Sequence, residues 1–140
     1  MLRSDRGSVI MMFPAAFMVM IVLGAIVIDV SLSQVRAREL EAVASSAAND
    51  ALAALDVAEL RTSGELRFDL DRARTIVSES VVRGALPDAT VVDVVVIDAG
   101  GALRLEVTLT LDVDFIMAPA LPGDLDSTTI TRTRSVSILG

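Results

Sequence analysis

The chain has 140 residues, 53% of them hydrophobic, and carries 12 basic against 19 acidic residues for a net charge of −7. This length holds one small domain beside an N-terminal segment, and the acidic balance argues against nucleic acid or anionic lipid as partners of that domain. Because cysteine, histidine, lysine, tyrosine and tryptophan are absent, the commonest general bases, nucleophiles and soft metal ligands are missing, and we do not expect an enzyme.

The first element is an uncharged apolar run of 21 residues, Ser8 to Ile28. As an α-helix it would be about 32 Å long, which matches a hydrocarbon core roughly 30 Å thick. Pro14 lies near its start, where the first amides of a helix have no internal partner anyway. We predict a cytoplasmic tail over 1–7 and a single membrane anchor over 8–28, surrounded by the lipid bilayer. The anchor positions singled out are Val9, Pro14, Phe17, Leu23, Ile28 and, as an interfacial residue at the boundary, Asp29.

A cleaved signal peptide is the alternative to a retained anchor. Such a peptide has an apolar region of about 7–15 residues that ends at a small-x-small cleavage site. Here the run is longer, and the first Ala-x-Ala pattern is Ala51-Leu52-Ala53, more than twenty residues beyond it. A retained anchor is therefore the preferred interpretation. Arginines flank the run on both sides in nearly equal number, so charge alone leaves the membrane orientation open.

The next segment, 29–60, is predicted to form an amphipathic, alanine-rich helix that continues the anchor without a break. No glycine or proline occurs from Leu32 through Leu55, and apolar residues recur at spacings of three and four. The resulting packing face consists of Leu40, Val43, Ala44, Ala47, Ala51, Leu52 and Leu55. Two uses of this face stay open: the core of the chain's own domain, or a surface that packs against another subunit.

Residues 61–140 are predicted to form a small α+β domain. A break at Thr62-Ser63-Gly64 precedes a second short helix, capped by Asp69 or Asp71 and ended by Gly84 and Pro87. The apolar face of this helix is predicted to comprise Leu70, Ala73, Ile76, Val77, Ser80 and Val81.

The hydrophobic period then changes from near four to two, which predicts a three-stranded antiparallel sheet. In the first strand, Val91, Asp93, Val95 and Ile97 are expected on one face, and Gly100-Gly101 is expected to form the hairpin turn after it. The second strand alternates apolar and polar residues over 103–113, and the third, over 127–139, places its threonines on one face.

The acidic pairs Asp69/Asp71, Asp112/Asp114 and Asp124/Asp126 do not have the spacing of a calcium loop, so we expect no metal and no cofactor. The apolar cluster Asp114-Phe115-Ile116-Met117 before Pro119 has two interpretations. It closes the core, or it forms an edge that binds a partner.

The N-terminal half resembles the TadE/TadG-like family of tight-adherence (Tad) pilus assembly proteins. The resemblance covers about residues 5–55 and is carried by Asp5-Arg6-Gly7, the run with its early proline, Ile28-Asp29-Val30, and Gln34 to Leu40 leading into the alanine-rich helix. It implies a single-pass anchor in the cytoplasmic membrane of a bacterium, beside a secretion system that builds Flp-type pili, with the C-terminal domain outside the cytoplasm. The fifth residue after Gly7 is Met12, where processed pilin-like members carry glutamate, so the chain is closer to the unprocessed TadG-like anchors.

The first hypothesis is therefore a non-enzymatic minor pseudopilin or anchoring subunit of a Tad-type pilus in the bacterial cell envelope. Its expected partners are other pilin-like or Tad secretion subunits, with oligomerisation possible through the N-terminal helix. The second hypothesis is a membrane-tethered extracytoplasmic binding module unrelated to pili, which would need a pocket with convergent polar groups.

Overall fold

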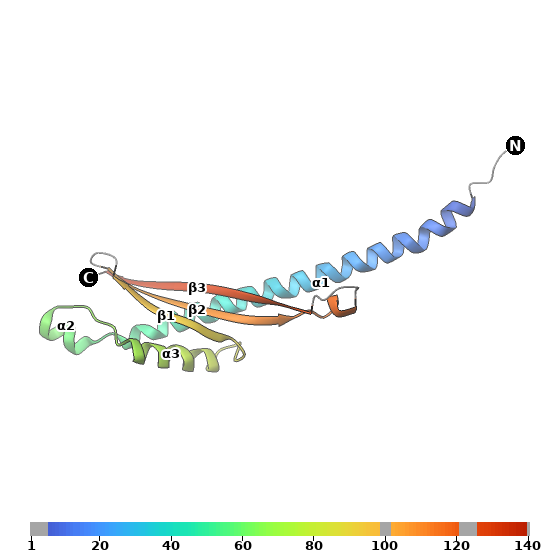
Figure 1. Ribbon diagram of the computed structural model, residues 1–140. Coiled ribbons are helices and arrows are strands. Elements are labelled where there is room, and N and C mark those ends of the chain that lie inside the picture. The colour runs from blue at the N-terminus through green and yellow to red at the C-terminus, as the bar shows by residue number, and fades with distance from the viewer. Residues whose placement is uncertain (1–5, 99–101, 121–125, 140) are drawn as a thin grey trace. The chain divides into compact units, whose positions relative to one another are not determined.

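The computed structural model of the chain describes residues 6–98, 102–120 and 126–139, with side chains for 12–98, 102–120 and 126–138 (Figure 1). The chain divides into two compact units. An N-terminal unit comprises Met1–Gln34 and Asp114–Thr128, and a sheet unit comprises Val35–Val113 and Thr129–Gly140. Residues 114–128 thus group with the predicted anchor, whereas the sequence pattern predicts one domain over 61–140.

Helix α1 runs without a break over Arg6–Asp50 and contains Pro14. The predicted continuation of the apolar helix into the alanine-rich helix is therefore confirmed. The helix ends earlier than residue 60, because a tight 3-10 turn, η1 (Ala51–Ala54), follows it. Leu55 is then extended and pairs with Phe68 in an isolated antiparallel bridge, which turns the chain away from the helix axis.

A short helix that the sequence analysis did not predict, α2 (Val57–Ser63), follows the bridge. Its first amides are capped by the Asp56 carboxylate, which accepts hydrogen bonds from the amides of Ala58 and Glu59, each at 3.0 Å. It ends at Gly64, whose φ of 77° is a left-handed conformation that glycine adopts without strain.

The predicted second helix is α3 (Leu70–Arg83), and its cap is Asp69 rather than Asp71. The Asp69 carboxylate accepts a hydrogen bond of 3.0 Å from the amide of Arg72. Gly84 follows the last turn, as predicted. Four of the six residues expected on its apolar face are buried, and the other two, Leu70 and Ile76, are half-buried. The buried four are Ala73, Val77, Ser80 and Val81.

The sheet has the predicted three strands, β1 (Thr90–Asp98), β2 (Ala102–Asp114) and β3 (Ser127–Leu139), in the order β1-β2-β3. Strands β1 and β2 are antiparallel, but their register shifts between Val91 and Asp93. This bulge places Val91 on the same face as Val94 and Val96, so the predicted grouping of Val91 with Val95 and Ile97 is wrong. The predicted turn at Gly100-Gly101 lies outside the described residues.

The core of the sheet unit lies between the inner face of the sheet and the two helices, and Figure 1 shows α3 and the C-terminal part of α1 running alongside the strands. The alternation predicted for β2 is confirmed, since its inward residues are buried while Arg104 and Asp112 are exposed. The inward residues are Leu105, Val107, Leu109, Leu111 and Val113. An ion pair between Arg134 of β3 and Glu41 of α1 lies beside this core.

The predicted packing face of α1 contributes to this core. Leu52 and Leu55, which follow the end of the α-helix, are half-buried, and the other members are buried. The buried members are Leu40, Val43, Ala44, Ala47 and Ala51. Of the two uses left open for this face, the structure has the first: the side chains are covered within the chain itself. Alanine at these positions lets neighbouring segments approach the helix backbone closely.

The close approach at Ala47, which is fully buried, can be tested with a larger side chain. Ala47→Leu should lower the free energy of unfolding of the full chain in detergent by about 1–3 kcal/mol, because added methylenes in a packed core force neighbours to shift. Ala42→Leu, on an exposed face of the same helix, should change it by less than about 0.5 kcal/mol. Equal effects of the two variants would contradict the assignment of this face to the core.

The cap of α3 is a second test, because two aspartates compete for the role. Asp69→Ala should destabilise the sheet unit by about 1 kcal/mol, since the amide of Arg72 loses its acceptor. Asp71→Ala removes only an exposed contact of 3.7 Å to Arg74 and should cost well under about 0.5 kcal/mol. Thermal unfolding of both variants measures the difference. A larger loss for the Asp71 variant would show that the cap is misassigned.

Candidate functional site

The most distinctive polar contact of the N-terminal unit centres on Asp29, which lies on α1 directly after the predicted anchor. The residue is only 5% exposed, and its carboxylate accepts hydrogen bonds from three successive backbone amides. Oδ1 accepts from Ile116 at 2.9 Å and from Met117 at 3.0 Å. Oδ2 accepts from Met117 at 3.2 Å and from Ala118 at 2.7 Å. We call residues 115–120 with this contact the docked loop.

The local chain geometry explains why three consecutive amides converge on one carboxylate. They precede and open a short 3-10 turn, η2 (Ala118–Ala120), in which the amide of Ala120 donates to the carbonyl of Met117 at 3.0 Å. The first amides of any helical turn have no partner within it and point in one direction. In this loop the missing acceptor comes from α1. Asp29 therefore caps the turn as an N-cap aspartate would, but from a distant part of the sequence.

The other end of the docked loop is held by its own backbone. The amide of Phe115 donates a hydrogen bond of 2.8 Å to the carbonyl of Asp126. This bond joins the segment that leaves β2 to the segment that enters β3. The loop is thus held at both ends, by Asp126 at its start and by Asp29 along its turn.

The electrostatics of the site favour the ionised carboxylate. Burial alone would raise the pKa of Asp29, but the hydrogen bonds from the amides of Met117, Ile116 and Ala118 outweigh it and hold the pKa below its ordinary value. Hydrogen bonds from backbone amides to an ionised acceptor are shorter and stronger than those between neutral groups. Asp29 is therefore a charged link between the helix and the loop. We call the hydrogen bonds between its carboxylate and the amides of 116–118 the clamp.

The side chains around the clamp are mainly apolar. Ala25, one turn before Asp29 on the same face of α1, is also buried. Phe115 is half-buried, whereas Ile116 is 62% and Met117 38% exposed. Of the two interpretations of this cluster, core closure is therefore wrong for Ile116 and Met117, because the loop is fixed by its backbone while these side chains stay uncovered.

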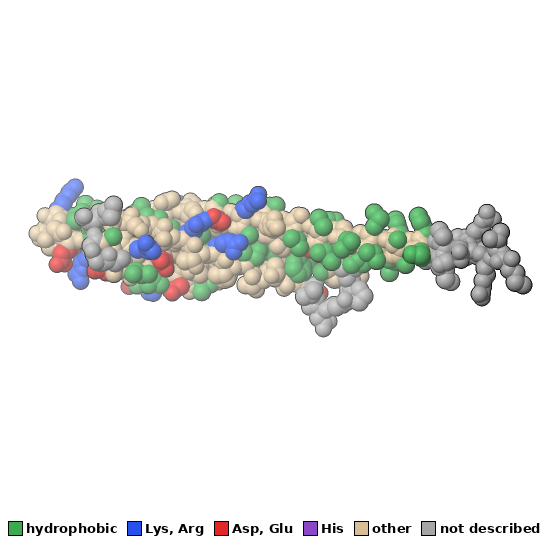
Figure 2. Space-filling view, turned by 90° about the horizontal axis from the view of Figure 1, so that it is seen from above, with side chains coloured by type: hydrophobic (Ala, Val, Ile, Leu, Met, Phe, Trp, Pro, Cys, Tyr) green, Lys and Arg blue, Asp and Glu red, His purple; other side chains and the backbone are tan. Residues whose placement is uncertain are grey.

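The other predicted anchor residues whose side chains are described are exposed. Phe17, Leu23 and Ile28 are all exposed, as is Pro14. Figure 2 shows hydrophobic side chains gathered along the described part of the apolar stretch of α1, on the face in view. The side chain of Val9 lies outside the described residues.

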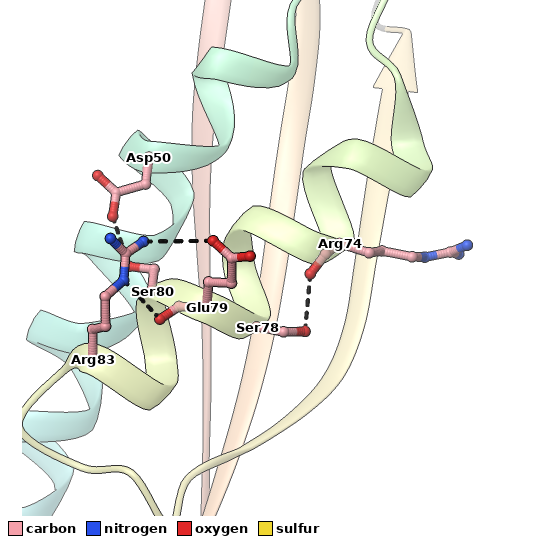
Figure 3. A network of polar contacts seen from close by, with 6 residues as sticks. All are labelled: Asp50, Arg74, Ser78, Glu79, Ser80 and Arg83. Atoms are coloured by element: carbon pink, nitrogen blue, oxygen red, sulfur yellow. Dashed lines mark hydrogen bonds and ion pairs between the residues drawn. The ribbon is translucent and has the colours of Figure 1, made fainter.

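A second polar network joins α1 to α3 in the sheet unit (Figure 3). The hydroxyl of Ser80, a mostly buried residue, donates a hydrogen bond of 2.7 Å to Oδ2 of Asp50. Arg83 donates to the carbonyl of Glu79 at 3.1 Å and approaches its carboxylate at 4.0 Å. The bond between Ser80 and Asp50 joins the last turn of α1 to the last turn of α3, and we assign it a structural role.

An open depression of about 390 Å³ lies beside this network, lined by Ser78, Glu79, Val82 and Arg83. Its polar groups already bond within α3, because Ser78 donates to the carbonyl of Arg74 and Arg83 pairs with Glu79 (Figure 3). Among the residues that the structure describes, no three acidic side chains come together in a way that would hold a metal ion. Asp124 lies outside those residues.

The helix α1 is long and apolar enough to cross a membrane, and little of its apolar stretch is buried. The same test is passed by a signal sequence, since the stretch lies near the N-terminus. Comparisons with protein-family models, curated proteins and solved structures find no match to this chain.

The clamp can be tested by removing the charge at Asp29. Asp29→Asn leaves one carbonyl acceptor and turns an amide donor toward the backbone donors, so hydrogen exchange at the amides of 116–118 should become faster. Asp114→Asn, an exposed change in the same unit, is the matched control and should leave their exchange unchanged. Unaltered protection in the Asp29 variant would contradict the clamp.

The pH dependence follows from the lowered pKa. The clamp is fully present above the ordinary pKa of an aspartate, about 3.9, and weakens below it. It is lost only as the pH falls through the lowered native value. The protection factors of amides 116–118 should therefore stay constant from neutral pH down to the ordinary value and fall below it. Loss of protection well above that value would show that the pKa is raised instead.

Proposed function

We propose that the chain is a non-enzymatic, single-pass subunit of a Tad-type (Flp) pilus assembly or secretion system, acting as a minor pseudopilin or anchoring subunit in a bacterial cytoplasmic membrane. The observation that carries the proposal is the unbroken helix α1, in which one stretch is apolar and exposed and the next is packed into a folded unit. Such a subunit has a mechanical role, since it holds a folded domain at the bilayer.

The exposure of the apolar stretch supports a membrane environment over a soluble core. A core helix of similar hydropathy would be mostly buried, whereas only 11% of the apolar window of α1 is covered. Large side chains such as Phe13, at 75% exposed, would be in contact with water if no lipid or partner surrounded them. Lipid removes this cost along the whole stretch.

The continuity of α1 also favours a retained anchor over a cleaved signal. The helix passes from the apolar stretch to Leu40, which is fully buried in the sheet unit, with no intervening loop. Asp29, between these two parts, is bonded to the docked loop. Cleavage after the apolar stretch would have to occur within a helix whose side chains take part in tertiary contacts.

The surfaces open to other subunits follow from what the chain covers itself. The alanine-rich face of α1 is occupied in the sheet unit, so side-by-side packing with pilin-like subunits is assigned to the exposed N-terminal half. Gly24 is one place for such contact, because no atom apart from its chain neighbours and the nearby backbone of its own helix lies within 4 Å of where its Cβ would be. A small residue there lets another helix approach closely within a bilayer.

The alternative function, a membrane-tethered binding module, has weaker support. It would need a pocket with several free, convergent polar groups. The depression beside α3 is open, and its polar side chains bond within their own helix. An enzyme is a poorer candidate still, since the sequence lacks the side chains that most often perform acid-base or nucleophilic catalysis.

A clean deletion in the native host tests the pilus role. We expect loss of surface pili, counted by electron microscopy, and recovery when the wild-type chain is supplied in trans. Ala42→Leu should complement as well as wild type. The double variant Phe17→Asp, Leu23→Asp should fail to complement, because charge within the span opposes insertion. Normal piliation of the deletion strain would contradict the proposal and leave the binding module as the better account.

The proposed orientation is tested separately. A C-terminal epitope tag should be degraded by protease added to intact spheroplasts, while a cytoplasmic control protein survives. Protection of the tag until the spheroplasts are lysed would place the sheet unit in the cytoplasm and rule out the proposed topology.

A further inference from the structure

We propose that the docked loop is a second membrane-contacting element, held by Asp29 so that Ile116 and Met117 lie in the interfacial layer of the bilayer. This inference rests on the membrane anchor of the proposed function and not on the pilus role. The occupant of this surface is lipid. Asp29 and the docked loop both belong to the N-terminal unit.

The position of the clamp along the bilayer normal follows from the length of the predicted span. The predicted span ends at Ile28, and its 21 residues match the thickness of the hydrocarbon core, so Asp29 falls at the boundary between hydrocarbon and headgroups. The amides of Ile116, Met117 and Ala118 lie within 2.7–3.2 Å of its carboxylate. The backbone of the loop is therefore fixed at the same depth.

At this depth the docked loop exposes apolar side chains. Ile116 and Met117 are exposed, and the next residues are Ala118, Pro119 and Ala120, none of them charged. On α1, the residues on either side of the boundary are also apolar and exposed, among them Val27, at 63%, and Val30, at 49%. Both α1 at this boundary and the docked loop thus expose apolar side chains, while Asp29 between them is buried and the exposed Asp114 lies just before the loop.

A loop is tolerated at this depth only if its backbone amides have hydrogen-bond acceptors. Backbone amides without acceptors are costly near hydrocarbon. The clamp satisfies the amides of Ile116, Met117 and Ala118, and the amides of Phe115 and Ala120 bond to Asp126 and Met117. The remaining residue, Pro119, has no amide hydrogen, so every backbone amide of the docked loop has an acceptor. The loop therefore presents apolar side chains without unpaired amides.

The chain itself supplies the means of testing this, because it contains no tryptophan. A single introduced tryptophan is then the only indole fluorophore, and its quenching by bromine on lipid acyl chains reports its depth. We would reconstitute the full chain in phosphatidylcholine vesicles, a neutral lipid that avoids any effect of the acidic domain. The test variant is Ile116→Trp, which keeps the backbone amide that donates a hydrogen bond to Asp29.

Two matched variants frame the result. Phe17→Trp, in the middle of the predicted span, should be quenched most by bromine deep in the acyl chain. Val82→Trp, on α3 of the sheet unit and 68% exposed, should be quenched by aqueous acrylamide and not by lipid. We expect Ile116→Trp to show blue-shifted emission and to be quenched most by bromine close to the headgroups. Adding Asp29→Asn to Ile116→Trp should reduce the lipid quenching and increase that by acrylamide.

Each outcome has a distinct meaning. If Phe17→Trp is quenched by lipid and Ile116→Trp behaves like Val82→Trp, the anchor holds and the interfacial loop is wrong. If Ile116→Trp is shielded from both acrylamide and bromine, the loop is covered by protein, from the same chain or a second copy of it, and the inference is overturned. If Phe17→Trp itself escapes lipid quenching, the anchor fails, and both the proposed function and this inference fail with it.

Discussion

The rest of the structure depends on one continuous helix whose N-terminal part is apolar and exposed and whose C-terminal part is buried. The N-terminal part of α1 exposes large apolar side chains such as Phe17, while its C-terminal part buries Leu40 and the alanines of the sheet unit. These parts need opposite surroundings, and a continuous backbone joins them with no loop to absorb a mismatch. The residue composition changes accordingly, from bulky apolar residues on all faces to a narrow stripe of small ones.

Asp29 lies where these two requirements meet, and its chemistry suits the position. A carboxylate at the edge of an apolar stretch is costly unless its charge is compensated. Here three backbone amides compensate it, and the same bonds satisfy the unpaired start of the η2 turn. One side chain thus removes two problems, a charge next to an apolar segment and a loop with unpartnered donors. Replacement by an apolar residue would remove the charge but leave the three amides without their acceptor.

Much of the fold could be predicted from the sequence because it depends on local periodicity. The alternation in β2 and the stripe containing Leu40 and Ala47 each mark one buried face, and Asp69 with Gly84 marks the ends of α3. The end of α1 could not be found this way. Residues Ala51–Ala54 favour helix by propensity, and the chain leaves the helix because Leu55 pairs with Phe68, a tertiary contact.

The bulge in β1 and the partner of Asp29 were beyond a single sequence for different reasons. Val91 and Val92 are the same residue type, so nothing distinguishes the residue that is inserted from the one that pairs. Asp29 binds backbone amides, which every residue except proline possesses, so the residue types of 116–118 do not identify them as its partners. The isolated acid at the end of the apolar run was the only local sign that a special contact exists there.

The separation of Asp29 from its partners along the chain also sets an order of events during synthesis. The amides that bind its carboxylate come 87 to 89 residues later. At about 5–20 residues per second, the ribosome needs roughly 4–18 s to reach them. During this interval the amides that bind Asp29 have not been made, so its carboxylate lacks the partners that it has in the folded chain. The docked loop therefore can form only after the chain has been synthesised beyond residue 118.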